Sequence, residues 1–171
     1  MNRYPLSQTQ LGIYITCLNS SDEGNYNLDM LYRLDEGVDL ARLSSALDAV
    51  IAAHPYVKSR IVSDAAGNPV FEERGDEPFS TPVIDVASID EARPRFGEDY
   101  DLLHDRLFRI EIYRTAKEGN WLYVDFHHIV FDGMSWSVFR DDLAKAYGGE
   151  ALETEKIDGF RIAEDEAALR S

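Results

Sequence analysis

Two alternating runs followed at once by a helical pattern restrict the possible folds of this chain. Apolar and polar residues alternate through 107–114 and again through 121–129, and the sequence AKEGN between them contains a glycine suited to a reversal. This arrangement predicts an antiparallel β-hairpin. After Gly133 the apolar period becomes helical, and it ends at Gly148–Gly149. The apolar positions of that helix are Trp136, Phe139, Leu143, Ala146 and Tyr147.

The second strand of this hairpin should present two different faces, because successive side chains of a strand point in opposite directions. One face carries Leu122, Val124, Phe126 and His128; the other carries Trp121, Tyr123, Asp125 and His127. His128 therefore ends an apolar row and is predicted to be largely buried and neutral, since burial disfavours the charged imidazole. His127 lies on the face that also holds a carboxylate and a phenol.

Helices and strands alternate in the rest of the chain as well. Ser7 and Gln10 have capping-box spacing and predict a helix start, and Asp39 predicts the cap of a second helix that ends before His54–Pro55. The apolar stripe of the first helix is Leu11, Tyr14, Ile15 and Leu18. Strands are predicted at 26–34, 57–62 and 70–73, and residues 76–94 are predicted to form a long loop with a short helix after Ser88.

Composition excludes several classes of function. A chain of 171 residues is the size of one domain, and its formal net charge of −15 repels nucleic-acid backbones and anionic lipid, although a basic partner surface stays possible. Cys17 is the single cysteine, so no internal disulfide is expected, and an inert buried thiol is predicted. No secretory signal is recognised, and no apolar run reaches the roughly 20 residues of a membrane span. The cytoplasm is therefore the expected location.

The strand–turn–helix segment holds the candidate chemistry. Asp132 and Gly133 are predicted to form the turn, and a neutral His128 beside a helix N-terminus would suit acyl transfer. Metal binding is not expected, because adjacent histidines face opposite ways and no third ligand follows at helical spacing. Phosphate-binding glycine loops and a GxSxG serine are also absent from the sequence. The pattern alone favours a core histidine and an ordinary helix cap, since short motifs recur by chance.

Three motifs resemble those of one family. HHIVFDG, residues 127–133, resembles the HHxxxDG signature of the condensation domains of nonribosomal peptide synthetases, and the Met–Ser that follows also fits. YPLSQTQLGIYI, residues 4–15, is similar to the first core motif, and HPYVKSRI, residues 54–61, is similar to the next, RHExLRTxF. In the latter, Pro55 replaces the glutamate and Lys58 replaces the arginine expected to pair with the signature aspartate. A lysine keeps the charge but lacks the bidentate fork.

This resemblance implies an α+β fold, a two-layer α/β sandwich that forms one lobe of a chloramphenicol-acetyltransferase-like domain. Two such lobes form a V, and phosphopantetheine arms of carrier proteins enter a tunnel between them from opposite ends. Residues 1–171 match the first lobe only and are therefore expected to be an N-terminal subdomain whose second lobe is missing. The implied partners are peptidyl or acyl carrier proteins, adjacent synthetase domains and that second lobe. The arms are substrate carriers, and no permanently bound cofactor is expected.

The resemblance also implies roles for individual residues in amide formation. His128 would take or hold the proton of the acceptor amine, while His127 would brace the site by hydrogen bonds. Asp132 would be structural, in contact with Lys58 or Arg60. Gly133 and Ser135 are the residues expected beside the pantetheine arm.

Alternatives within and outside the family are weighed on the same motifs. An epimerization domain shares the signature and the fold, and its second base lies in the second lobe. A catalytically inactive carrier-protein docking module is the non-enzymatic alternative, against which the intact His128, Asp132 and Gly133 argue. Coenzyme A acyltransferases keep only HxxxD, and heterocyclization domains replace the histidines by aspartates; neither matches this sequence.

Overall fold

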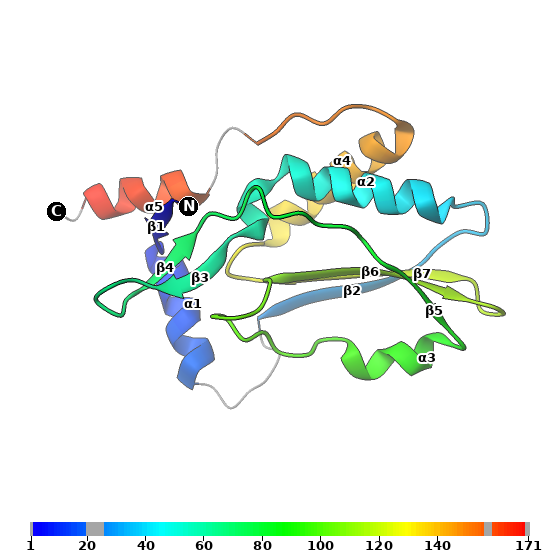
Figure 1. The fold of residues 1–171 in the computed structure, drawn as a ribbon, viewed down its shortest axis with the longest axis horizontal. Coiled ribbons are helices and arrows are strands. Elements are labelled where there is room, and N and C mark those ends of the chain that lie inside the picture. Colours follow the sequence, from blue (N-terminus) through cyan, green and yellow to red (C-terminus); the bar gives the residue numbers. More distant parts are fainter. Residues whose placement is uncertain (1, 20–25, 156–158, 170–171) are drawn as a thin grey trace.

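The computed structural model of the protein describes residues 2–19, 26–155 and 159–169 (Figure 1). The first half contains β1 (Arg3–Pro5), α1 (Gln8–Asn19), β2 (Asn27–Arg33), α2 (Leu40–Ala53), the 3-10 helix η1 (Pro55–Lys58), β3 (Arg60–Ser63) and β4 (Pro69–Glu72). The second half contains β5 (Val83–Val86), α3 (Ile89–Ala92), the 3-10 helix η2 (Arg93–Arg95), β6 (Phe108–Thr115), β7 (Asn120–His127), α4 (Gly133–Gly148) and α5 (Gly159–Ala168). Within these residues no helix is long and apolar enough to cross a bilayer.

A four-stranded sheet in the order β2-β7-β6-β5 forms the centre of the molecule. Helices α2 and α4 cover one face, and the short α3 lies against the other (Figure 1). The predicted α+β fold with a helical layer on a sheet is therefore confirmed. The predicted hairpin is confirmed too, because β6 and β7 pair antiparallel, with Ile110 opposite Val124 and Phe108 opposite Phe126.

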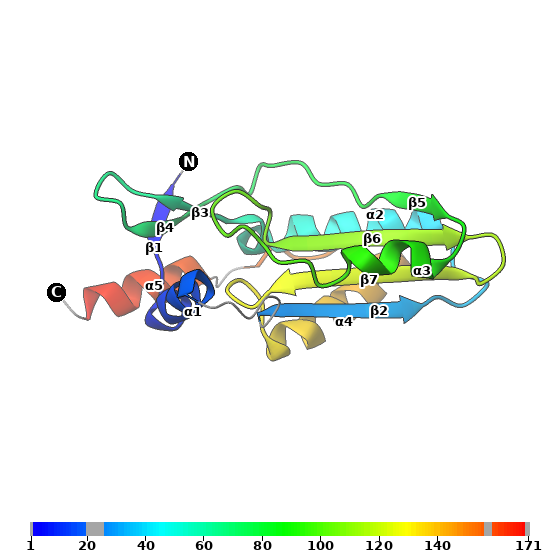
Figure 2. The same cartoon turned by 90° about the horizontal axis from the view of Figure 1, so that it is seen from below.

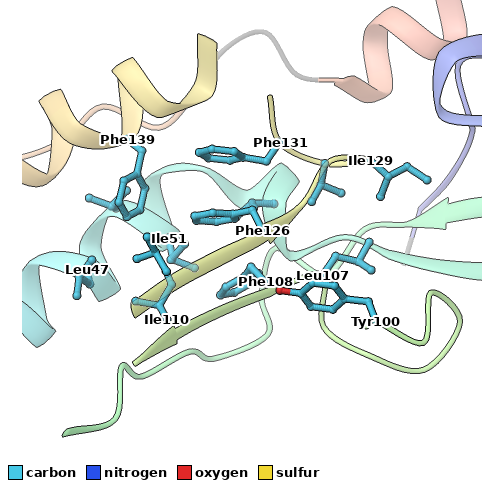
Figure 3. Close-up of a cluster of buried hydrophobic side chains, with 14 of the residues drawn as sticks. Leu47, Ile51, Tyr100, Leu107, Phe108, Ile110, Phe126, Ile129, Phe131 and Phe139 are labelled. Atoms are coloured by element: carbon cyan, nitrogen blue, oxygen red, sulfur yellow. The ribbon is translucent and has the colours of Figure 1, made fainter. Parts of the chain in front are cut away.

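The main core lies between this sheet and helices α2 and α4. Phe126 of β7 stacks on Phe131 with their ring centroids 4.0 Å apart, and Phe139 of α4 meets Phe126 edge-on at 5.5 Å (Figure 3). Leu47 and Ile51 of α2 are almost fully buried in the same cluster. Burying large apolar side chains contributes most of the stability of a domain of this size, so this cluster fixes α4 against the end of β7.

A smaller sheet, β1-β4-β3, lies at one end of the larger one, beside α1 and α5 (Figures 1 and 2). Phe160 of α5 stacks on Tyr4 of β1 with 4.3 Å between ring centroids. Neither β1 nor α5 was expected from the sequence. The three residues of β1 are too few to show a period of two, and α5 is held by aromatic contacts with distant parts of the chain.

The helix caps follow the sequence closely. The Ser7 N–H donates to Gln10 Oε1 at 2.9 Å and the Gln10 N–H donates to Ser7 Oγ at 3.2 Å, which is the predicted capping box. Asp39 caps α2 through the N–H groups of residues 41 and 42. Helix α4 ends at Gly149, whose φ of 91° favours glycine. These three predicted helix boundaries are confirmed.

Two expectations about strands are wrong in part. The strand expected over 57–62 begins only at Arg60, because Pro55 opens a 3-10 turn through residue 58. The region 76–94 contains the short helix expected after Ser88, but it also contains β5, which pairs parallel with β6. The four residues of β5 are too short for a clear period, and pairing with a distant strand stabilises them.

Candidate functional site

The candidate site is the turn that joins β7 to α4. Strand β7 ends at His127, and the chain turns through residues 128–130 before α4 begins at Gly133. The His128 N–H donates to the Tyr26 carbonyl at 2.8 Å, and the Val130 N–H donates to the His127 carbonyl at 3.1 Å. The backbone of the turn is therefore held both by its own residues and by the segment before β2.

His128 lies on the surface, so its predicted burial is wrong. The alternation of faces stops at the end of β7, where the turn directs the next side chain away from the core row. Ile129, Val130 and Phe131 fill the core instead, with exposed fractions of 9% or less. Figure 3 shows Ile129 and Phe131 in the buried cluster with Phe126. The His128 ring has an edge contact with Tyr26, with 6.5 Å between centroids.

His127, in contrast, is the buried histidine, with 3% of its surface exposed. Its Nδ1 accepts the N–H of Ile129 at 3.2 Å, and its Nε2 lies 3.7 Å from Cys17 Sγ. Burial, together with repulsion from His128, lowers the pKa of His127 to about 4, so the ring is neutral at pH 7. An Nδ1 that accepts a hydrogen bond leaves the proton on Nε2, which faces the thiol. His127 therefore braces the turn, as the resemblance implied.

Cys17 is half-buried rather than fully buried. Burial and the charge of Asp99 raise the pKa of its thiol, which keeps the sulfur protonated at neutral pH. A protonated thiol is a poor nucleophile, and the predicted inert role of Cys17 fits this geometry.

The face of β7 that holds His127 also holds a buried ion pair. Asp125 is fully buried, and its Oδ2 lies 3.0 Å from Arg109 Nη1. The Arg109 guanidinium carbon lies 3.9 Å from the centre of the Tyr100 ring, and the Tyr100 hydroxyl donates to the Asp125 carbonyl at 3.1 Å. Burial raises the pKa of the Asp125 carboxyl despite the guanidinium. This network supports the strand behind the turn and does not reach the exposed His128.

Asp132 is exposed and acts as the N-cap of α4. Its Oδ1 accepts both the N–H and the hydroxyl of Ser135, each at 2.8 Å, and its own N–H donates to Ser135 Oγ at 3.3 Å. The Ser135 N–H lowers the pKa of the Asp132 carboxyl. Because Asp132 accepts the Ser135 N–H, this donor of the helix N-terminus is not available to an oxyanion.

Lys58 and Arg60 do not contact Asp132, so the predicted pairing is wrong. Lys58 is buried, and its Nζ donates to the carbonyls of Gly75 and Glu77. Arg60 forms an ion pair with Glu77, with 2.7 Å between Nη2 and Oε1. Residues 55–60 lead into the small sheet, which directs both basic side chains toward residues 75–77.

Gly133 occupies open space in this lobe. A Cβ added there would meet nothing within 4 Å, and Gly133 is not among the glycines with positive φ. The expectation that a special backbone conformation requires this glycine is therefore wrong. Any close approach to Gly133 must come from a molecule or chain outside the described residues.

A half-open cavity of about 430 Å³ lies on the α2 side of the turn. Its apolar wall includes Val50, Phe131 and Val138, and Asp132, Ser135 and His54 line its polar side. His128 is not among the residues that line it. The turn therefore separates the exposed imidazole from this apolar hollow.

His54, which the sequence suggested only as the end of a helix, clamps three segments beside this cavity. Its Nε2 lies 2.9 Å from Asp142 Oδ2 of α4, and its Nδ1 lies 3.3 Å from Glu155 Oε2. Glu155 also accepts the N–H of Tyr56 at 2.8 Å. The hydrogen bond with Glu155, reinforced by Asp142, raises the pKa of His54. Only the tertiary fold brings these two carboxylates together, so no local signal in the sequence announced the cluster.

We expect this clamp to make stability fall as the solution becomes alkaline. A raised folded pKa means that protonated His54 stabilises the fold fully below its unfolded pKa of about 6.5, and that this contribution is lost as pH rises through the folded pKa. Urea unfolding at pH 6 to 9 should show the decrease. His54→Gln should remove it, and identical pH profiles for variant and wild type would contradict the clamp.

Replacing the Asp132 cap has a modest expected effect. Asp132→Ala should lower the free energy of unfolding by about 1 kcal/mol, the usual value of an N-cap, because the carboxylate is exposed and pairs only locally. Asp132→Asn should stay near wild type, because asparagine caps equally well. Both are measured by urea denaturation. A loss above 3 kcal/mol in both variants would instead indicate a buried ion pair.

Comparisons with known proteins agree with this site and fold. A family model described as Condensation domain matches residues 1–168. A plipastatin synthase of Bacillus subtilis is 30% identical over 158 residues, and bacitracin synthase 3 of Bacillus licheniformis is 29% identical over 152 residues. These matches cover 90% and 88% of this chain but only 6% and 2% of those proteins.

Solved structures show the same fold. The condensation domain from the monacolin K polyketide synthase superposes with a TM-score of 0.82 at 21% identity, covering 99% of this chain and 40% of that one. The starter condensation domain of the rhizomide synthetase gives a TM-score of 0.80 at 19% identity, covering 99% and 46%. The X-domain from teicoplanin biosynthesis, solved in complex with OxyB, gives 0.77 at 26% identity, covering 100% and 40%. The chain thus spans less than half of each of these solved chains.

Proposed function

This chain belongs to the condensation domain family, and we propose that it is the N-terminal lobe of a domain that forms amide bonds between substrates held on carrier proteins. One observation carries the proposal: of two adjacent histidines, His127 is buried and braces the turn, and His128 is presented on the surface at the end of a rigid strand. Such a division provides a fixed support and an accessible imidazole, which is what a positioned acid–base group requires.

In the proposed reaction the acceptor amine attacks the thioester carbonyl of the donor. A nitrogen–carbon bond forms, the carbon–sulfur bond breaks, and the proton that the amine loses balances the proton that the leaving thiolate gains. His128 takes that proton or orients the amine while His127 fixes the turn. Asp132 holds the start of α4, and no ion pair with Lys58 or Arg60 enters the proposal.

We propose that the substrates arrive on phosphopantetheine arms of peptidyl or acyl carrier proteins, and that the neighbouring domains of a synthetase supply them in the cytoplasm. The open space at Gly133 supports a close approach by such an arm, since nothing in this lobe fills it. Ser135 lies two residues further along α4, and both residues are proposed to lie beside the arm.

A second lobe completes the proposed site. Three observations support it: His128 faces outward, the solved relatives are more than twice as long, and α1 exposes an apolar stripe. Leu11, Ile15 and Leu18 of that stripe are 36%, 50% and 63% exposed. Apolar residues gathered on one helix face mark an interaction surface more often than isolated ones do.

The complete domain, assayed in D2O with donor- and acceptor-loaded carrier proteins, tests this function. Amide formation should give a dipeptidyl thioester on the acceptor carrier, detected by mass spectrometry. Deuterium at the α-carbon of an aminoacyl thioester without a new amide bond would identify an epimerization domain instead. Neither product, with the carriers still bound, would identify an inactive docking module. The first outcome alone supports the proposal.

A further inference from the structure

The side chain of Gln10 connects the first helix to the turn that carries His128. Its Oε1 accepts the N–H of Ser7 at 2.9 Å and so completes the cap of α1. Its Nε2 donates to the carbonyl of Ile129 at 3.0 Å and also to the Tyr56 hydroxyl. One half-buried amide therefore joins α1, η1 and the residue directly after His128.

The peptide that follows His128 is held on both sides by these bonds. The Ile129 N–H donates to His127 Nδ1, and the Ile129 carbonyl accepts from Gln10. The His128 N–H is bound to the Tyr26 carbonyl. The other two bonds come from the histidine pair itself and from the segment next to β2, whereas Gln10 links the turn to a helix more than a hundred residues earlier. The direction of the exposed imidazole depends on this backbone.

We propose that Gln10 is a positioning residue: its amide holds the Ile129 carbonyl and thereby sets the direction in which His128 presents its imidazole. The inference rests on the proposed function for its effect on rate, but the hydrogen bond it invokes can be tested separately. Gln10 touches no reacting atom and acts only through the turn.

The chemistry explains why an amide suits this position. The cap of α1 requires an acceptor, which glutamine and glutamate both supply. The Ile129 carbonyl requires a donor, which an ionised glutamate lacks. Gln10→Glu therefore keeps the cap, removes the donor and places a carboxylate against a carbonyl oxygen. Ser7→Ala is the matched control, since it removes the Ser7 Oγ acceptor of the cap and leaves the contact with Ile129 in place.

The first measurement uses NMR on this chain. In Gln10→Glu we expect the ring resonances of His128 and the amide resonance of Val130, which follows the Ile129 carbonyl, to shift. In Ser7→Ala these resonances should stay near their wild-type positions. Gln10→Met, which lacks both donor and charge, should shift them as well. Unchanged His128 resonances in the glutamate and methionine variants would overturn the proposal, whether or not the complete domain is active.

The second measurement uses kinetics of the complete domain. Misdirecting an acid–base group lowers turnover without weakening binding, so Gln10→Glu and Gln10→Met should lower kcat at least tenfold with KM for the loaded carriers unchanged. Ser7→Ala should keep wild-type kcat even if its melting temperature falls. An equal loss of kcat in Ser7→Ala would make Gln10 merely structural. An inactive wild type would refute the proposed function, and the NMR result would still decide whether Gln10 directs His128.

Discussion

His128→Ala is expected to abolish most of the amide-forming activity of the complete domain while leaving this lobe folded. A positioned acid–base group contributes ~10²–10⁴-fold to a rate, so a loss in that range is expected. Because the side chain is exposed and makes an edge contact with one ring, truncating it should change the free energy of unfolding by less than ~0.5 kcal/mol. Dipeptidyl-thioester formation and thermal unfolding measure the two quantities.

The neighbouring His127→Ala is the matched control, because the same substitution one residue earlier should act in the opposite way. It leaves the N–H of Ile129 without its acceptor inside the core, which costs about 1–3 kcal/mol. The melting temperature should therefore fall clearly in this variant and hardly at all in His128→Ala. Equal falls would show that His128 is a packing residue, and the catalytic role proposed for it would be wrong.

The sequence predicts most of the framework around the turn, and the reason is local. The β6–β7 hairpin and helix α4 follow from periods of two and 3.6 that continue for eight or more residues. The Ser7–Gln10, Asp39 and Asp132 caps need only residues within one turn of helix. Patterns of this kind are complete within a short window, so no knowledge of the tertiary fold is needed.

Burial of His128 could not be predicted in the same way. Alternation assigns it to the core row, but the strand stops one residue earlier because His127 and Tyr26 hold the turn. Those bonds depend on β2, which lies about a hundred residues away in the sequence. The contact of Asp132 with Lys58 or Arg60 was expected from a family motif that this sequence matches imperfectly. Here the basic side chains bind residues 75–77, and the helix cap satisfies the aspartate.

The largest effect is expected from removing nothing but the proposed second lobe. This 171-residue chain, assayed alone with donor- and acceptor-loaded carrier proteins, should form no peptide bond. Amide formation requires the amine and the thioester carbonyl to be held together, and such positioning supplies about 7–11 kcal/mol of the barrier. The single lobe presents His128 to water, where the developing charge is screened by bulk solvent instead of being stabilised by fixed donors.

Folding should not be the cause of this inactivity. The cluster around Phe126, Phe131 and Phe139 is buried within the lobe, so cooperative thermal unfolding is expected for the chain alone. Mass spectrometry should then find dipeptidyl thioester only at the rate seen without protein, while the two-lobed domain forms it under the same conditions. Product above that background, lost on His128→Ala, would show that one lobe positions both substrates. In that case His128 would act from an open surface, and the tunnel between two lobes would not be needed for the chemistry.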